Sequence, residues 1–574
     1  MSAKRKLKQS AKVFFKPGTR RFKVARKIAE VLEIVPPLSL DNRYLEWVER
    51  TEPYTWSDPI ELDYKPKISV VVPVFNPPAQ HLLPMAYSVV NQTYDNWELI
   101  LVNASTKPEC RRQAENLKSA DERIRVVNLQ TNKGIAGNTN AGIEKASGDY
   151  IALLDHDDLL APAALYETVL AIQNERNAGL IYSDEDKITA NGEERFDPHL
   201  KPDWSPQLLR ELNYLNHFTV IKKDLIEKIG GYRHGFDGAQ DYDLFLRLAD
   251  ERPAIIHVPK VLYHWRTSET STANDFSSKK NILDAGVRAL EEHLERNRQA
   301  GTIAPIAKQP GFYKIRYAPA AKGSVAVIIM PSPIRSQYKV LVETIVTKLR
   351  RTDLAADIYA EELVEKTTYA IPDNAVINYI AAKTNRKFIE KALERTSAET
   401  LIIIGAALVP GTETWLEDLS SVVAQVSDIG LAVPLITAAD NKTVVDAGQV
   451  LQDGRTKSLF RGLPKDTHTY IGNVNWVRNL DSVSGRCFAV RTKVFKDYLK
   501  TASGTEINAQ DMCAYLASRG LQIVLWPFVT FTYRGELAPG THEAGYFSPA
   551  LSVTKEDFNL PKTINMPDPE ETDD

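Results

Sequence analysis

The chain has few cysteines and no long apolar run. Its 574 residues include only Cys110, Cys487 and Cys513, which are too widely spaced for a disulfide framework or a zinc cluster and favour a reducing compartment. Neither a membrane-spanning apolar run nor a signal-peptide core appears, so we expect no membrane span and no export by that route. The net charge of −3 lacks the basic surplus of nucleic-acid-binding proteins, so no nucleic-acid partner is expected.

Acidic residues are absent before Glu30, whereas eleven Lys and Arg residues occur between Lys4 and Lys27, interleaved with Phe14, Phe15 and Phe22. One interpretation is a surface arm for anionic lipid, because each basic side chain near such a membrane contributes about 1 kcal/mol. The other is a solvated or disordered terminus, or one that contacts RNA non-specifically. The opposite end, residues 561–574, is an acidic tail.

Short β-branched runs alternate with helical patterns from residue 67 onward. "KISVVVPVF", "WELILVN", "IRVVNL" and "DYIALLD" read as buried strands, and amphipathic or polar stretches separate them. This alternation predicts βαβ units and a mainly parallel sheet, in which ligands bind at the carboxyl ends of the strands.

The same pattern is written twice. "SVAVIIMPSP" parallels "ISVVVPVFN", "TLIIIGAALVPGTETWL" parallels "YIALLDHDDLLAPAAL", "INAQDMCAYLASRG" parallels "DGAQDYDLFLRLAD", and "IVLWPFVTFTYRGE" parallels "IIHVPKVLYHWRTSE". Four segments in the same order predict two copies of one α/β domain. We expect a basic arm and helical lead-in at residues 1–66, a first domain at 67–310, a second at 311–560, and the tail at 561–574.

Three carboxylates, Asp155, Asp157 and Asp158, follow the strand "YIALL" within four positions. Buried next to one another they would cost several kcal/mol each unless a positive charge sits among them. A divalent cation shared with substrate phosphates meets this need. The alternative is that Asp158 caps the next helix and the other two are solvated loop acids.

Further polar residues follow in fixed order. "GAQDYDLFLRL" places Asp241 and Asp243 at the start of an amphipathic helix. One explanation is that the helix dipole favours carboxylates there, and the other is that Asp241 is a general base. "VLYHWRT" puts His264 and Arg266 on one side of a strand. The imidazole can bind a cation and the guanidinium a diphosphate, although a histidine in an aromatic strand is more often a core residue.

Taken together, "VVPVFN", "DHDD", "QDYD" and "YHWR" in this order resemble the family 2 glycosyltransferases of GT-A fold, closest to the bacterial two-domain enzymes of O-antigen and rhamnan-type polysaccharide synthesis. The resemblance covers residues 67 to about 275 and extends more weakly to the second copy. It implies two tandem GT-A, Rossmann-like domains with mainly parallel sheets, the second degenerate.

The resemblance also implies roles, residue by residue. Binding of the nucleotide-sugar donor would fall to Pro73, Val74, Phe75, Asn103, Asp155 and Arg266. Asp157 and His264 would ligate Mg²⁺ or Mn²⁺, and Asp241 would deprotonate the acceptor hydroxyl for inverting attack. Asp158 and Asp243 would support the site.

Two departures from the family pattern stand out. Asn103 and Ala104 occupy the position of the paired acids that follow the second strand, although the Asn103 amide oxygen can still accept a hydrogen bond from a pyrimidine imide. Thr139 replaces a frequent arginine. The first departure alters the group that would contact the base, and the second removes one possible phosphate contact.

The second copy lacks the acids. Aligned, Asp155 falls on Gly405, Asp157 on Ala407, Asp243 on Cys513 and His264 on Thr532, whereas Asp511 matches Asp241 and Arg534 matches Arg266. We therefore predict a domain that binds no metal–nucleotide-sugar and serves in scaffolding, dimerisation with itself or partner transferases, or holding glycan. A second, metal-independent transferase is the competing reading.

The leading hypothesis is an inverting, metal-dependent hexosyltransferase, cytoplasmic or peripheral on the inner face of the cell membrane. It would move a sugar, in the first instance L-rhamnose from dTDP-rhamnose, to a growing, lipid-linked bacterial surface polysaccharide. The alternatives are an inert scaffold or binding protein and a nucleotidyltransferase. The latter should have a Gly-rich basic loop where this chain has "PVFNPPAQ".

Overall fold

The structure is a computed structural model that describes residues 44–45, 47–48, 61–267, 279–307, 309–319, 324–332, 334–349, 354–362, 371–405, 407–452, 455–504 and 506–535. The basic arm at residues 1–27 and the acidic tail at residues 561–574 lie outside these ranges, and what we expect of them stays a prediction. Within the described ranges, no helix combines the length and the apolar character that crossing a membrane requires.

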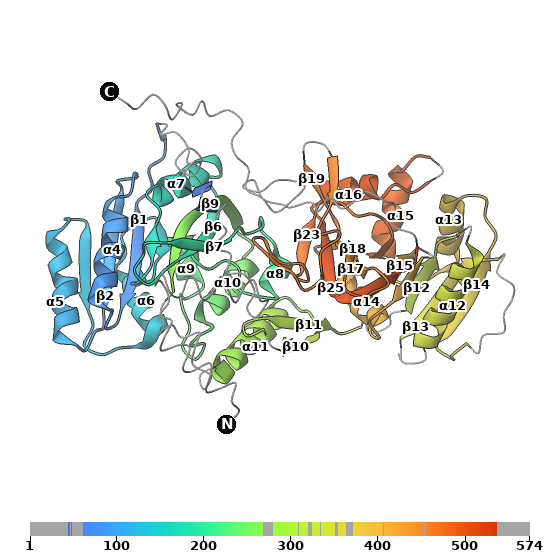
Figure 1. Cartoon of the computed structure of the whole chain (residues 1–574), viewed down its shortest axis with the longest axis horizontal. Coiled ribbons are helices and arrows are strands. Elements are labelled where there is room, and N and C mark those ends of the chain that lie inside the picture. Colours follow the sequence, from blue (N-terminus) through green and yellow to red (C-terminus); the bar gives the residue numbers. More distant parts are fainter. Residues whose placement is uncertain are drawn as a thin grey trace, which may run out of the picture.

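A mixed sheet of nine strands occupies one half of the molecule (Figure 1), in the order β3-β2-β1-β4-β8-β6-β9-β5 with β7 paired to β6. β1 to β4 are parallel to their neighbours in this group, and β8 runs antiparallel to β4 and β6. Its strands are β1 (Ile68–Val74), β2 (Trp97–Asn103), β3 (Ile124–Asn128), β4 (Tyr150–Leu153), β5 (Leu159–Leu160), β6 (Ala178–Ile188), β7 (Arg195–His199), β8 (Thr219–Lys222) and β9 (Ala254–Arg266).

Helices of this half connect and cover the strands. They are α4 (Ala79–Val90), α5 (Pro108–Asn116), α6 (Gly134–Lys145), α7 (Ala164–Asn174), α8 (Pro206–Leu209), α9 (Lys223–Lys228), α10 (Gln240–Asp250) and α11 (Lys279–Arg296), with a 3₁₀ turn at Leu117–Ser119. The β1 segment forms a strand because its β-branched valines suit a sheet that is covered on both faces. α4 buries Leu82, Met85, Ala86 and Val89, which recur at helical spacing along one face.

A second sheet of ten strands repeats this order as β14-β13-β12-β15-β24-β17-β25-β16, with β18 paired to β17 and β23 to β25. The strands are β12 (Ser324–Ile329), β13 (Ala355–Glu361), β14 (Ala375–Ile380), β15 (Thr400–Ile404), β16 (Leu408–Pro410), β17 (Ile429–Thr437), β18 (Val444–Asp446), β23 (Arg478–Leu480), β24 (Cys487–Arg491) and β25 (Gln522–Tyr533). The helices are α12 (Arg335–Leu349), α13 (Asn385–Arg395), α14 (Trp415–Gln425), α15 (Thr492–Thr501) and α16 (Ala509–Ser518). Small hairpins pair β19 (Gln449–Gln452) with β20 (Arg455–Ser458) and β21 (His468–Thr469) with β22 (Gly472–Asn473).

The strand order confirms the predicted tandem α/β architecture, because each strand of the first sheet has a counterpart in the same place in the second. The register supports the alignment residue by residue. His264 pairs with Leu159, and Thr532 pairs in the same way with Val409. The Asp158 amide donates to the Asp155 carbonyl oxygen, and the Leu408 amide donates to that of Gly405. Asp155 and Gly405 therefore occupy equivalent positions.

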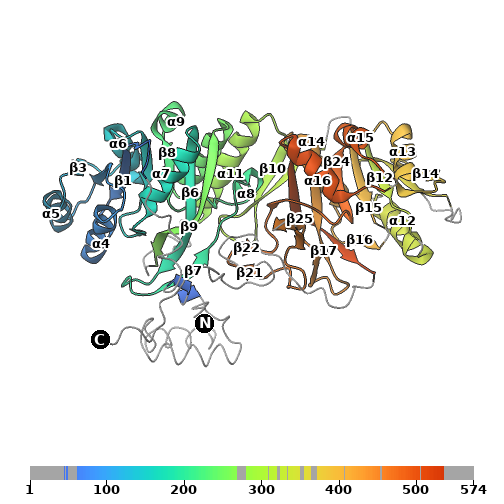
Figure 2. The same cartoon turned by 90° about the horizontal axis from the view of Figure 1, so that it is seen from above.

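A hairpin of β10 (Gly301–Pro305) and β11 (Tyr313–Tyr317) lies with α11 between the two sheets (Figures 1 and 2). The Tyr313 ring stacks on Tyr242 of the first sheet's half at 5.6 Å, and the Tyr317 ring packs against Trp526 of the second at 6.1 Å. Direct contacts add to this junction, including the Val477 amide, which donates to the Glu211 carboxylate at 2.6 Å. The two halves therefore share one buried apolar core.

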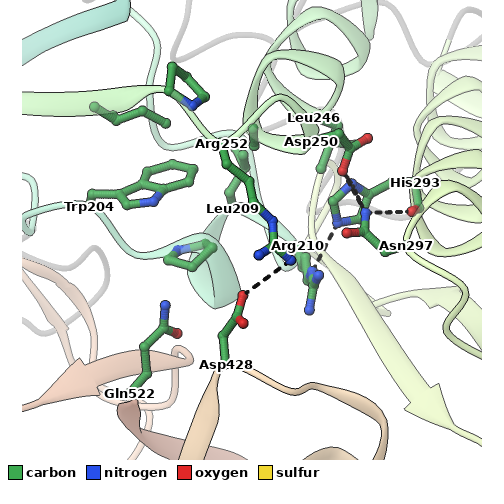
Figure 3. Close-up of a pocket in the computed structure, with 14 residues that line it drawn as sticks. Trp204, Leu209, Arg210, Leu246, Asp250, Arg252, His293, Asn297, Asp428 and Gln522 are labelled. Atoms are coloured by element: carbon green, nitrogen blue, oxygen red, sulfur yellow. Dashed lines mark hydrogen bonds and ion pairs between the residues drawn. The ribbon is translucent and has the colours of Figure 1, made fainter. Parts of the chain in front are cut away.

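A cavity of about 240 Å³ opens at the same junction (Figure 3). The Arg252 guanidinium faces Asp428 across it at 4.0 Å, and the Arg210 Nε donates to His293 Nε2 at 3.0 Å. None of the residues expected at the functional site lines this cavity. It belongs to the contact between the halves, and the candidate site lies elsewhere.

Candidate active site

The acidic cluster begins where β4 ends, as predicted, but its three carboxylates have different surroundings. Asp158 is 1% exposed, and its carboxylate accepts hydrogen bonds from the Tyr263 hydroxyl at 2.5 Å and from the Arg266 amide at 2.7 Å. Asp158 thus fastens the cluster to β9 and does not cap the following helix. Asp155 and Asp157 are half-buried, and within the described part of the chain no group donates a hydrogen bond to either carboxylate.

Burial disfavours the ionised form of the acids in this corner. Burial is the main cause that raises the pKa of Asp155, and the charge of Asp157 adds to it. Burial raises the pKa of Asp158 still further, with Asp155 contributing. Two acids that are hard to ionise side by side are a setting in which an incoming cation is favourable.

His217 brings a positive charge to this corner that sequence reasoning missed. Burial lowers its pKa, but Glu185, Asp158 and Asp155 outweigh burial and raise it to about 9. The imidazole stacks on Tyr263 with the ring centroids 5.1 Å apart, and its Nδ1 lies 3.1 Å from the Glu185 carboxylate. We expected a positive charge among the acids, and the His217 imidazole is one group that carries such a charge.

Glu185 itself sits in a buried ion cluster within β6. Burial opposes its ionisation, but Lys201 and His217 lower its pKa below the ordinary range. The Lys201 ammonium donates to the Glu185 carboxylate at 3.3 Å and is completely buried as a side chain. The segment "YSDEDK" carries the acids of this cluster and forms part of the buried strand β6.

His264 on β9 lies opposite Leu159 of β5. Its Nδ1 is 2.6 Å from the Asp186 carboxylate. Asp186 also accepts from Arg195 Nε and from the Tyr44 hydroxyl, both at 2.5 Å. Metal-binding histidines commonly have one ring nitrogen held by a carboxylate in this way, which leaves Nε2 for the ligand. Within the described residues, however, no group of three or more metal-binding side chains converges here.

Arg266 was expected to grip a diphosphate, but it holds protein backbone. Its Nε donates to the carbonyl oxygen of Asp157 at 2.6 Å, and its Nη1 donates to that of Ala190 at 3.2 Å. In this arrangement the guanidinium fixes the loop that carries Asp157.

Asp241 and Asp243 separate into two roles at the start of α10. Asp241 accepts hydrogen bonds from the Tyr232 hydroxyl at 2.8 Å and from Gln240 Nε2 at 3.0 Å, both neutral donors. Burial raises its pKa, which the Tyr232 hydrogen bond lowers in part and the charge of Asp155 raises further. Asp243 is buried against Arg247, whose Nη2 donates at 2.7 Å, and against Arg233. Within the described residues, Asp241 therefore has no ion-pair partner, although the charge of His217 acts on it, whereas Asp243 is part of a structural ion cluster.

The residues expected around the nucleotide base follow β1 and β2. Val74 is completely buried, and Phe75 is 43% exposed. The Pro73 carbonyl oxygen lies 3.2 Å from His156 Nδ1. Asn103 is fully buried, with its Nδ2 donating to Asn128 at 2.9 Å and its Oδ1 accepting from the Ser105 amide at 3.2 Å. The Asn103 amide is thus engaged within the protein. Of the residues expected around the base, Pro73 is partly exposed and Phe75 is the most exposed.

Comparison with known proteins gives a family match within this half of the chain. Residues 69–230 match the model of a family described as "Glycosyl transferase family 2". The chain carries a family 2 glycosyltransferase domain. Asp155, Asp157 and Asp158 lie within the matched residues, and Asp241, His264 and Arg266 follow them.

Curated relatives extend beyond this domain. The uncharacterized protein y4gI of Sinorhizobium fredii is 32% identical over 503 residues, which are 83% of this chain and 54% of that protein. The O-antigen biosynthesis protein RfbC of Myxococcus xanthus is 32% identical over 474 residues, 80% of this chain and 37% of that protein. The chain thus spans about half or less of the length of these relatives.

Among solved structures, residues 1–349 of Staphylococcus aureus TarS match at 15% sequence identity with a TM-score of 0.33, over 40% of this chain and 68% of that one. The mannosyltransferase PcManGT of Pyrobaculum calidifontis, solved with GDP-Man and Mn²⁺, matches at 14% identity with a TM-score of 0.32, over 44% of this chain and 72% of that one. The family assignment rests on the sequence match and not on these weaker likenesses.

Proposed function

We propose that this protein is an inverting, metal-dependent glycosyltransferase that extends a bacterial surface polysaccharide, with its catalytic domain at residues 67–310. The family 2 match and the similarity to an O-antigen biosynthesis protein over 80% of the chain support this proposal. The observation that carries it is the contrast among the acids. Asp155 and Asp157 face no protein donor within the described residues, whereas the neighbouring Asp158 and Asp243 are fully bonded.

A divalent cation fits the side chains that the site presents. Asp157 offers a carboxylate without a protein donor, and His264 is oriented by Asp186. Mg²⁺ and Mn²⁺ are commonly bound by one or two protein side chains, with substrate phosphates and water completing the shell, so a group of three protein ligands is not required. Bound there, the ion would neutralise the charge that develops on the leaving nucleoside diphosphate.

Asp241 is the proposed general base. Tyr232 and Gln240 fix its orientation without neutralising it, and its raised pKa brings its basicity closer to that of an effective base. Its carboxylate accepts the proton of the acceptor hydroxyl as the oxygen attacks the anomeric carbon, on the side opposite the leaving diphosphate. Inversion at that carbon follows. Phe75 offers an exposed ring against which a nucleotide base can pack.

The finer assignments follow the family resemblance. The donor is proposed to be dTDP-L-rhamnose and the acceptor a lipid-linked glycan. The same proposal places the enzyme at the inner face of the cell membrane, where residues 1–27 would bind anionic lipid. The second domain, residues 311–560, is proposed to be catalytically inert, because Gly405 and Ala407 stand where Asp155 and Asp157 stand in the first.

Donor hydrolysis without acceptor tests the proposal. The protein is incubated with a panel of nucleotide-sugars, including dTDP-rhamnose, in Mn²⁺ or in EDTA, and nucleoside diphosphate release is followed. We expect release from one donor in Mn²⁺ only, and a loss of about 100-fold or more in Asp157→Ala. Asp224→Ala, which removes an exposed carboxylate on α9, is the matched control and should leave the rate unchanged.

No Mn²⁺-dependent hydrolysis of any donor would leave the scaffold alternative standing. If half or more of the rate persists in Asp157→Ala, the second copy is itself active and the inert assignment is wrong.

A further inference from the structure

The second sheet carries a cavity of about 550 Å³ at the carboxyl end of β12. Its walls come from segments far apart in the sequence, including Met330 just after β12, Asn385 at the start of α13, Gly485 before β24 and Gln510 in the first turn of α16. A volume of this size falls within the range of about 300–1,000 Å³ that is typical of small-molecule sites.

This cavity is the counterpart of the candidate active site. The strand register places Met330 where Pro73 stands, because Val71 pairs with Leu153 and Ile328 pairs with Ile403. Gln510 occupies the first turn of α16, as Gln240 does in α10. The second copy thus has a hollow at the place that corresponds to the candidate active site of the first.

The chemistry of the lining has changed from ionic to neutral. Its side chains include one carboxylate, Glu506, and no cation. Asn385 Nδ2 donates to Glu506 at 2.9 Å. The nearby Arg486 stacks on the Tyr533 ring, 4.7 Å from its centroid. A nucleoside diphosphate would find neither a metal site nor a positive side chain on these walls.

Amide groups remain available instead. In the described part of the chain, the Gln449 side chain has no hydrogen-bond partner, and Gln510 uses only its Nε2, toward Thr456 at 3.1 Å. Asn508 uses its Oδ1 to cap α16, which leaves Nδ2. Carboxamides offer donors and acceptors side by side, which matches hydroxyl groups that both donate and accept.

We propose that this cavity binds a neutral stretch of glycan and so holds the polysaccharide while the first domain extends it. That the ligand is this polysaccharide rests on the proposed function. The cavity and its neutral amide lining do not depend on it.

Binding of neutral oligosaccharides to the full chain tests the inference. The probes are immobilised neutral oligosaccharides containing rhamnose, mannose, galactose or glucose, with dTDP-rhamnose and UDP-glucose as competitors. Gln510→Trp places a large side chain at the exposed rim of the cavity. Ala517→Trp, at another exposed position of α16, is the matched control.

We expect at least one oligosaccharide to bind, with affinity reduced about tenfold or more, or about 1.4 kcal/mol, in Gln510→Trp and unchanged in Ala517→Trp. Neither nucleotide-sugar should compete. The inference is overturned if no oligosaccharide binds, if Gln510→Trp binds as well as the parent, or if a nucleotide-sugar displaces the glycan. Donor hydrolysis, measured in parallel in Mn²⁺, reports on the proposed function alone, so a failure of either proposal is distinguishable from a failure of the other.

Discussion

The carboxyl group of Glu211 makes the stability of the junction between the two halves depend on pH. Glu211 is 3% exposed and accepts the Val477 amide at 2.6 Å. Burial raises its pKa from 4.5 to about 8, although the Val477 amide and Arg478 lower it in part. Between these two pH values the folded protein holds a proton that the unfolded chain has released. Stability therefore falls as pH rises from about 4.5 to about 8 and levels off above.

The magnitude follows from the shift. The pKa of Glu211 rises from 4.5 to about 8, and each pKa unit corresponds to about 1.36 kcal/mol. The loss of unfolding free energy between these pH values is therefore at most about 5 kcal/mol. Glu211→Gln keeps an oxygen to accept the Val477 amide but has no proton to lose. We expect the variant to match the parent near pH 4.5 and to exceed its free energy of unfolding by several kcal/mol at pH 8.

Urea unfolding from pH 5 to pH 8, followed by tryptophan fluorescence, measures the difference between parent and variant. Glu144→Gln is the matched control, because Glu144 is a glutamate whose side chain is 73% exposed. That control should differ from the parent by the same small amount at every pH. If Glu211→Gln is less stable than the parent at pH 8, then Glu211 is ionised and paired with Arg478, and the reasoning from burial is wrong.

Three further substitutions separate the roles of the site residues. Asp241→Asn should lower kcat by about 10²–10⁴ with stability unchanged. In the parent, the acid limb of the pH–rate profile should lie above the ordinary aspartate range, since the pKa of Asp241 is raised; a limb at or below that range would count against the assignment. Asp243→Asn, two residues away, should cost about 3–5 kcal/mol of stability by stranding Arg247, while the folded fraction keeps its rate. Asp186→Asn should raise the Mn²⁺ concentration for half-maximal donor hydrolysis about 10–100-fold, with the maximal rate restored at high Mn²⁺; an unchanged requirement would remove His264 from the metal site.

The sequence predicts the architecture well because the information about it is local and repeated. The spacing of the valines in β1 predicts a strand, and the spacing of the leucines in α10 predicts a helix. The second copy of each motif supports the same prediction independently.

The sequence predicts the electrostatics of the site less well, because charges in it are paired across distant segments. The acids of "SDEDK" in β6 contact His217, Lys201 and His264, which come from other segments of the chain. No spacing rule in the sequence points to these partners. Asn103 and Arg266 illustrate the converse. Both side chains have the right chemistry for a ligand but are engaged by protein groups that only the fold brings to them.

The two copies differ in a way that separates folding from chemistry. β15, the counterpart of β4, is buried along its length, so the apolar framework is intact where Gly405 and Ala407 replace the acids. The fold of the second copy therefore does not require acids equivalent to Asp155 or Asp157 at the end of this strand. In the first copy, Asp155 is crowded against Asp158, which is hydrogen-bonded to β9, and the Asp155 carboxylate has no hydrogen-bond donor among the described residues. Acidic residues that the fold does not require, at a position where burial disfavours their charge, are explained if a bound cation pairs with them. The second copy has the same scaffold without the acidic cluster, which supports the proposal that the cluster serves binding and catalysis rather than folding.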